Sequence, residues 1–116
     1  MAVEFKFCPL FYETSEKHFR NEKVKKQFGQ FMASKTTNPL QPFGGKDYPF
    51  INDGFLAGFK HAGMTQDISL IYSISGRNPT LIYCYGFFTH AESGTGNDAS
   101  IKRQKNLAQR MQGQKF

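Results

Sequence analysis

Apolar and polar positions follow two different periods along the first third of the chain. Residues 2–7 carry valine and two phenylalanines in weak alternation, which predicts a short strand that ends at Pro9. Thr14 and Ser15 are typical N-cap residues, so a first helix is expected to begin there. Between Glu22 and Lys35 the apolar residues fall at i, i+4, i+7 and i+8, which predicts a second helix with one apolar face. The residues of that face are Val24, Phe28, Phe31 and Met32.

Three further strands are predicted after a long connection. Residues 36–57 contain several prolines and glycines, and so long a connection in a small domain is often functional. Strands are expected at about 56–64, 67–74 and 80–88, and the middle one alternates clearly. Residues 76–79, Gly-Arg-Asn-Pro, predict a turn, so the last two strands should pair as an antiparallel hairpin.

A final helix is predicted at about 98–112. Gly94-Thr95-Gly96 interrupts the pattern, and Asn97 or Asp98 is the expected N-cap. On a helical wheel, the apolar residues Ile101, Leu107, Ala108 and Met111 gather opposite the basic residues Lys102, Arg103, Lys105 and Arg110. We therefore expect one α+β domain over residues 1–116, a small antiparallel sheet with helices packed on it, in the order β-α-α-β-β-β-α.

The net charge of +6 is concentrated at one end of the sequence. Residues 99–116 hold five Lys or Arg and no acid, whereas residues 1–98 are nearly balanced. A local positive surface attracts a polyanion such as nucleic acid, although a solvated helix face is the other interpretation. No apolar run is long enough for a membrane span, and Cys8 and Cys84 do not form a disulfide framework. We therefore expect a cytoplasmic protein, in which the Cys84 thiol is reduced and buried.

Residues 46–90 contain the side chains best suited to chemistry. The predicted strands direct Tyr48, His61, Asp67 and His90 toward a single sheet. A surface histidine and an aspartate that opens a strand are the ordinary alternatives for His90 and Asp67. We expect His18, in the first helical region, to lie at the surface.

Four segments of this stretch, in order, resemble the RelE/YafQ-like toxins of type II toxin–antitoxin systems. Lys46-Asp47-Tyr48-Pro49-Phe50 is similar to the Lys-Asp-His-Pro-Leu segment of the YafQ branch, and Gly58-Phe59-Lys60 to its Gly-aromatic-Arg. Asp67-Ile68-Ser69-Leu70-Ile71-Tyr72 is similar to Asp-x-x-Leu-Ile-Tyr, and Phe88-Thr89-His90 takes the place of Gly-[Ser/Thr]-His.

The chain departs from the family pattern at several positions. Tyr48 and Gly63 stand where the family has histidines, although His61 lies two residues before Gly63 and shares its strand face. Gly86 replaces the arginine usually found four residues before the last histidine. The chain also continues beyond His90 into a basic helix, whereas YafQ-type chains end soon after.

The resemblance implies a RelE-like fold and a cytoplasmic, metal-independent endoribonuclease that needs no cofactor. Such a toxin cuts mRNA, typically within the ribosome, and a cognate antitoxin silences it. Cleavage would proceed by 2′-OH attack on the neighbouring phosphate, with a base, an acid and a cation to stabilise the phosphorane. His90 is the first candidate for acid or base, and Asp67 would orient a histidine or act as base. His61 and Tyr48 are weaker candidates.

Cations and stacking rings are expected from several parts of the chain. Because the strand arginine is absent, the terminal helix is the first expected source of a phosphate clamp. Its basic residues are Lys102, Arg103, Lys105 and Arg110, and the next candidates are Lys46 and Lys60. Single-stranded bases could stack on Phe87, Phe88 or Tyr85. Two other functions remain open, namely a non-catalytic ParE-like inhibitor of DNA gyrase and a basic RNA-binding module.

Overall fold

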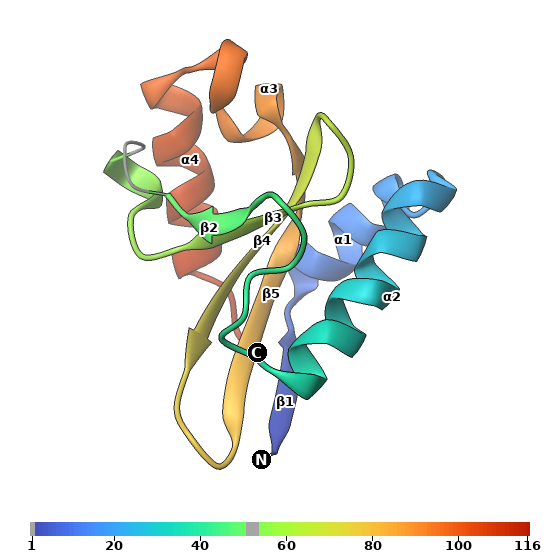
Figure 1. The fold of residues 1–116 in the computed structure, drawn as a ribbon. Helices are drawn as coiled ribbons and strands as arrows, with labels where there is room; N and C mark the ends of the chain where they lie inside the picture. The colour runs from blue at the N-terminus through green and yellow to red at the C-terminus, as the bar shows by residue number, and fades with distance from the viewer. Residues whose placement is uncertain (1, 51–53) are drawn as a thin grey trace.

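The computed structural model describes residues 2–50 and 54–116, and a five-stranded sheet forms its centre (Figure 1). The strand order is β1-β5-β4-β3-β2. The strands are β1 (Val3–Phe7), β2 (Asp47–Pro49), β3 (Lys60–Gly63), β4 (Ile68–Ser75) and β5 (Thr80–Thr89). The predicted β4–β5 hairpin is confirmed, and all neighbouring pairs are antiparallel except β1–β5, which is parallel.

Four α-helices accompany the sheet, and the expected α+β class is confirmed. They are α1 (Pro9–His18), α2 (Glu22–Thr37), α3 (His90–Ser93) and α4 (Ile101–Gln112), with short 3₁₀ turns at Gly54–Leu56 and Gly96–Asp98. In Figure 1, α1 and α2 lie on one side of the sheet and α4 on the other. None of the described helices combines the length and apolar character needed to cross a bilayer.

The start of α1 corrects one sequence expectation. Pro9 does follow the first strand, but it also opens the helix, since its fixed φ suits the first helical position. Thr14 and Ser15, expected at the N-cap, lie inside α1 and are buried. The hydroxyl of Thr14 donates to the carbonyl of Leu10 one turn back and accepts a hydrogen bond from the Phe87 N–H at 3.1 Å. Thr14 therefore ties α1 to β5 instead of starting the helix.

The terminal helix also begins differently from the expectation. Ser100 is the N-cap, and its side chain accepts a hydrogen bond from the Arg103 N–H. Ile101, expected on the docked stripe, is 65% exposed, and Gln104 takes the buried position instead. Gln104 can be buried because its Nε2 donates to the carbonyl of Gly94 at 2.8 Å. The rest of the stripe, Leu107, Ala108 and Met111, is buried as expected.

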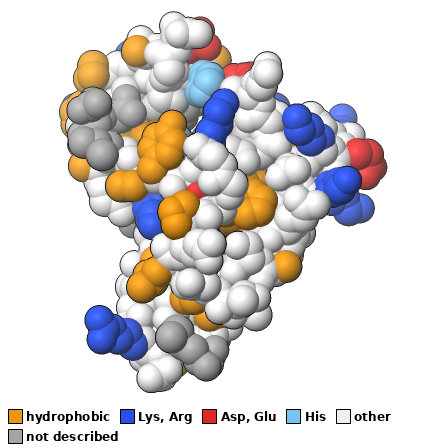
Figure 2. Space-filling view, viewed as in Figure 1, with side chains coloured by type: hydrophobic (Ala, Val, Ile, Leu, Met, Phe, Trp, Pro, Cys, Tyr) orange, Lys and Arg blue, Asp and Glu red, His pale blue; other side chains and the backbone are white. Residues whose placement is uncertain are grey.

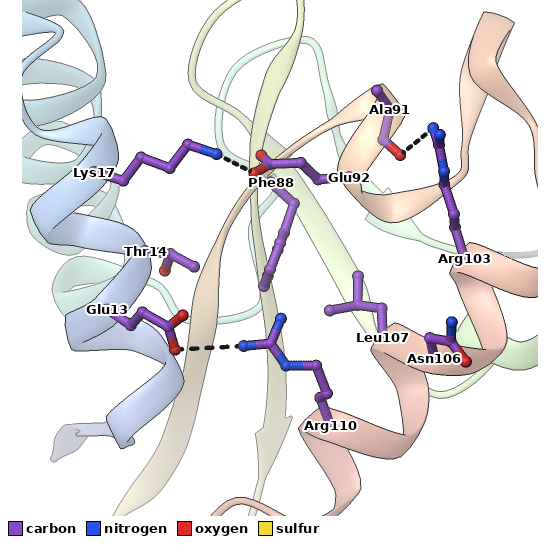
Figure 3. Close-up of a pocket in the computed structure, with 10 residues that line it drawn as sticks. All are labelled: Glu13, Thr14, Lys17, Phe88, Ala91, Glu92, Arg103, Asn106, Leu107 and Arg110. Carbon is purple, nitrogen blue, oxygen red and sulfur yellow. Dashed lines mark hydrogen bonds and ion pairs between the residues drawn. The ribbon is translucent and has the colours of Figure 1, made fainter.

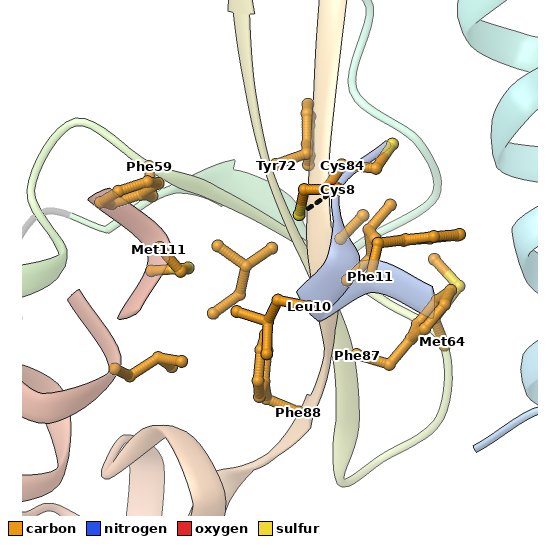
Figure 4. Close-up of a cluster of buried hydrophobic side chains, with 14 of the residues drawn as sticks. Cys8, Leu10, Phe11, Phe59, Met64, Tyr72, Cys84, Phe87, Phe88 and Met111 are labelled. Atoms are coloured by element: carbon orange, nitrogen blue, oxygen red, sulfur yellow. Dashed lines mark hydrogen bonds between the residues drawn. The ribbon is translucent and has the colours of Figure 1, made fainter. Parts of the chain in front are cut away.

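Aromatic rings fill much of the core between the sheet and α1 and α2. Phe87 of β5 contacts Phe11 of α1, with ring centroids 5.5 Å apart (Figure 4). It also contacts Phe28 of α2, with centroids 5.3 Å apart. The expectation for Cys84 is met, since its thiol is fully buried, and this burial raises its pKa. The core thus fixes β5, the strand that leads directly into His90.

The long connection predicted at 36–57 contains a strand that the sequence did not indicate. Strand β2 adds to the sheet edge through pairs such as Tyr48 with His61. Residues 51–53 of this connection lie outside the described residues. The connection therefore places Tyr48 on the edge strand, opposite His61 of β3, instead of leaving it on a loop.

Candidate active site

The ends of β2, β3 and β5 and the start of α3 enclose a small pocket, which we call the histidine pocket. Tyr48 lies opposite His61 across the β2–β3 pair, and His90 begins α3 directly after β5. The pocket has a volume of about 240 Å³. Its lining includes all three of these side chains together with Phe50, Ser69, Ile71, Phe88, Ser93, Thr95 and Gly96. Three of the four predicted catalytic residues therefore meet in one cavity.

Two aromatic rings hold the imidazole of His61. The Tyr48 ring centroid is 4.3 Å from that of His61 with the rings nearly perpendicular, and the Phe50 centroid is 4.5 Å away. Tyr48 is 50% exposed and Phe50 is buried, so Tyr48 lies at the mouth of the pocket and Phe50 at its inner wall. Phe50 was not singled out in the sequence, although its spacing of two from Tyr48 is the signal for a shared strand face.

Asp67, the fourth predicted catalytic residue, contacts His90. The His90 N–H donates to Asp67 Oδ1 at 3.1 Å, and His90 Nδ1 lies 3.5 Å from the same oxygen. The His90 side chain is 38% exposed, in keeping with its expected place at a strand end. A carboxylate beside Nδ1 favours a proton on that nitrogen, which leaves Nε2 available to exchange a proton with a substrate. Asp67 is thus positioned to orient His90.

Glu92 connects α3, the helix that carries His90, to α1. Its carboxylate lies 2.6 Å from Lys17 Nζ and 3.2 Å from His18 Nε2, and it accepts the Thr89 N–H in a capping box. Partial burial raises the pKa of Glu92, but Lys17, the Thr89 N–H and His18 together outweigh this effect and lower the pKa to about 2. His18 was expected at the surface, but it is only 8% exposed because it packs against this carboxylate.

The basic residues of α4 do not enter the histidine pocket. Arg103 and Arg110 line a separate open cleft of about 550 Å³ between α1, α3 and α4, which we call the arginine cleft (Figure 3). There Arg103 Nη1 donates to the carbonyl of Ala91 at 3.0 Å, and Arg110 Nη2 lies 3.3 Å from Glu13 Oε2. Both guanidinium groups are therefore already engaged by groups of the protein.

The terminal helix was expected to clamp the phosphate on which His90 acts, but its arginines and His90 line different cavities. Lys102 and Lys105 are exposed on α4 and line neither cavity. Among the described residues, no lysine or arginine lines the histidine pocket. Phe88 lines both cavities and separates them. Its ring is 5% exposed, so it forms a wall and presents no open face to a base.

Of the other predicted contact residues, neither Tyr85 nor Lys60 lines the histidine pocket. Tyr85 is half-buried and packs edge-on against Phe59, with ring centroids 5.0 Å apart. The ammonium of Lys60 lies 5.8 Å from the centroid of the Tyr72 ring. Because Lys60 and His61 are adjacent in β3, their side chains point to opposite faces of the sheet.

Lys46 lies close to the histidine pocket. Its side chain lies over Gly63, the position where the family pattern has a histidine. The Gly63 N–H donates to the Lys46 carbonyl at 2.7 Å. A Cβ atom at Gly63 would lie 3.1 Å from Lys46 Cβ and 3.4 Å from its Cδ. The aliphatic part of Lys46 therefore occupies the space above Gly63, on the strand face shared with His61.

A buried ionic network holds the residue before Tyr48. Asp47 accepts hydrogen bonds from Lys35 Nζ at 2.7 Å, from the Phe43 N–H at 2.7 Å and from the Tyr72 hydroxyl. Lys35 also donates to the carbonyl of Gln41. Burial and the bond to Asp47 raise the pKa of Tyr72, so its hydroxyl remains a donor. This network fixes β2, and hence Tyr48, to α2.

No group of three His, Cys, Asp or Glu side chains in the described part of the chain is arranged to hold a metal ion.

Comparison with known proteins relates the structure to toxins, by fold alone. No family model matches the chain. No curated protein sequence matches it either. Solved structures do match, among them a YoeB/ParE toxin from Agrobacterium tumefaciens, with 15% sequence identity and a TM-score of 0.60 over 78% of this chain and 99% of that one.

Two toxin–antitoxin complexes show the same fold. The E. coli DinJ–YafQ complex matches at 20% identity and a TM-score of 0.61, over 78% of this chain and 96% of that one. The YoeB–YefM complex from Staphylococcus aureus matches at 16% identity and a TM-score of 0.58, over 78% of this chain and 99% of that one. The chain therefore has the fold of RelE/YafQ-like toxins, as the resemblance of its sequence implied, and about a fifth of it has no counterpart in these structures.

Proposed function

We propose that the protein is the toxin of a type II toxin–antitoxin system, an endoribonuclease that cuts mRNA by 2′-OH attack on the adjacent phosphate without a metal ion. The observation that carries this proposal is the histidine pocket, where two imidazoles and a phenol meet and Asp67 holds His90. Two histidines in one cavity are the groups that an acid–base cleavage of RNA requires. The fold shared with YafQ and YoeB toxins supports the same function.

In this proposal each side chain of the pocket has a role. His90, oriented by Asp67, exchanges a proton at Nε2 with either the attacking 2′-oxygen or the departing 5′-oxygen, and His61 serves the other of these two oxygens. As acid and base, the two histidines need opposite protonation states, so the rate should follow a bell-shaped pH profile. Tyr48, exposed at the pocket mouth, donates a hydrogen bond to the phosphate or stacks on a neighbouring base.

The proposed partners are mRNA, the ribosome and a cognate antitoxin, all in the cytoplasm. The matching YafQ and YoeB structures include complexes with the antitoxins DinJ and YefM. A small acidic protein encoded beside this chain is the expected antitoxin. Its presence in the neighbouring reading frame would support the proposal independently of any activity.

The test compares the wild type with His90→Ala during expression in bacteria. We expect the wild type to stop growth and cleave transcripts, and the variant to lose at least about 100-fold in cleavage, which is the usual contribution of a positioned acid or base. Thermal melting of the purified variant checks that it folds. Toxicity with intact transcripts would contradict the nuclease and favour a ParE-like inhibitor, and cleavage at the wild-type rate by His90→Ala would contradict the assigned role.

A further inference from the structure

A third cavity, a groove of about 410 Å³, lies between α2 and the turn that joins β3 to β4. It is lined by Lys23, Gln27 and Gln30 of α2, by residues 43–46 and by residues 63–66, and we call it the α2 groove. We propose that this groove binds the sugar–phosphate backbone of a single-stranded RNA whose cleaved linkage lies in the histidine pocket. The proposal rests on the proposed function and specifies how that site holds its substrate.

The α2 groove carries a charge that suits a phosphate backbone better than the mixed charge of the arginine cleft does. Lys23 and Lys46 supply two cations, and no acid is found among the described residues that line the groove. The arginine cleft, in contrast, contains Glu13 and Glu92, which are paired with its cations. An ammonium group without a competing carboxylate keeps more of its attraction for a phosphate.

Lys46 joins the groove to the histidine pocket. Its side chain lines the groove and lies across Gly63, whose strand partner Ser69 lines the pocket. A Cβ atom at position 63 would make a tight contact of 3.1 Å with Lys46 Cβ, so glycine here leaves more room for the lysine stem. A backbone that passes over Gly63 would therefore meet Lys46 between the groove and the two histidines.

Lys23 marks the other side of the groove. Together with Gln27 and Gln30 it lies on one face of α2, whereas Lys25 is two residues away and points to the other side. The glutamine amides offer uncharged donors for phosphate and ribose oxygens. Figure 2 shows Lys and Arg side chains gathered over the end of α1 and α2, with another positive side chain against a histidine on the same face.

The test measures binding of a fluorescent, 2′-O-methylated single-stranded RNA by anisotropy at several salt concentrations. The methyl groups remove the attacking hydroxyl, so binding is observed without cleavage. Lys46→Met keeps the aliphatic stem over Gly63 and removes the charge, and Lys23→Gln removes the other cation. Each should weaken binding about fivefold near 0.1 M salt and reduce the salt slope by about 0.7, the effect of one lost phosphate contact. Lys25→Gln, with the same loss of charge on the same helix, should bind within about twofold of the wild type.

Several results would overturn the proposal. The proposal is overturned if the wild-type protein does not bind the RNA, or if the Lys23 and Lys46 variants bind it as the wild type does. It is also overturned if Lys25→Gln weakens binding as much as those two variants. Unmodified RNA separates this inference from the nuclease. Binding that depends on Lys23 and Lys46, without cleavage of the unmodified RNA either free or on ribosomes, would support the groove and contradict the enzyme. Cleavage that depends on neither lysine would contradict the groove alone.

Discussion

At position 86 the backbone of β5 passes so close to α1 that a side chain has no room. A Cβ atom there would lie 2.6 Å from Thr14 Oγ1 and 3.0 Å from the Phe88 ring, and φ is +155°. The register of β4 and β5 shifts at the same place. The arginine that the family pattern carries here is therefore excluded by packing, and the cation for the phosphate has to come from another part of the chain.

We predict that Gly86→Ala destabilises the protein by about 1–3 kcal/mol, because the added methyl group forces Thr14 or Phe88 to move. Urea denaturation gives the change in free energy of unfolding. The control is Gly29→Ala in the exposed middle of α2, where no atom lies within 4 Å of the new Cβ. That control should stabilise the protein by about 0.5–1 kcal/mol. Equal effects at the two positions would contradict the packing argument.

The individual site residues were predictable where a strand pattern fixed their direction. The predicted strands were enough to bring His61 and His90 toward one sheet, and the structure places both in one pocket. Tyr48 joins them through β2, which the sequence did not indicate. The environments of His18 and Glu92 were not predictable, because their contact joins segments 74 positions apart. A helical wheel describes one helix and carries no information about what covers it.

Among the elements, β2 is defined by its contacts with other elements and not by a pattern of its own. It is three residues long and ends at Pro49, which cannot donate a ladder hydrogen bond, so no periodic pattern marks it in the sequence. The Lys35–Asp47 pair holds it against α2, and both side chains are fully buried. The elements α2, β4 and β5 were predictable for the opposite reason, since each carries a pattern of apolar residues that is visible in the sequence.

We predict that Asp47→Asn destabilises the protein by about 3–5 kcal/mol, because it leaves the buried Lys35 ammonium without its counter-ion. The double variant Lys35→Met/Asp47→Asn should cost less than the sum of the two single changes, since no charge then remains buried. Denaturant titrations of the four proteins complete the cycle. Strictly additive costs would show that the pair is not coupled.

At the scale of the whole molecule, acid stability should depend on Glu92. Its pKa of about 2 lies below the ordinary value near 4.5, so ionisation stabilises the folded state above pH 4.5 and this contribution is lost as the pH falls toward 2. Since the side chain is 31% exposed, we expect a loss of about 1–2 kcal/mol.

Glu92→Gln keeps the capping geometry without the charge. It should be less stable than the wild type at pH 7, and the two proteins should converge near pH 2. Denaturation midpoints measured across that range test the link between α1 and α3, and parallel curves for the two proteins would contradict it.

Strand β1 pairs in parallel with β5, and this pairing affects the order of folding. Val3 pairs with Thr80, so β1 leaves the ribosome long before its only partner among the described strands has been made. In that interval its valine and phenylalanines form an unpaired edge that neighbouring nascent chains can join. Closing so long a loop is slow. Because slower synthesis lengthens that interval, the yield of native protein should fall when translation is slowed at constant temperature.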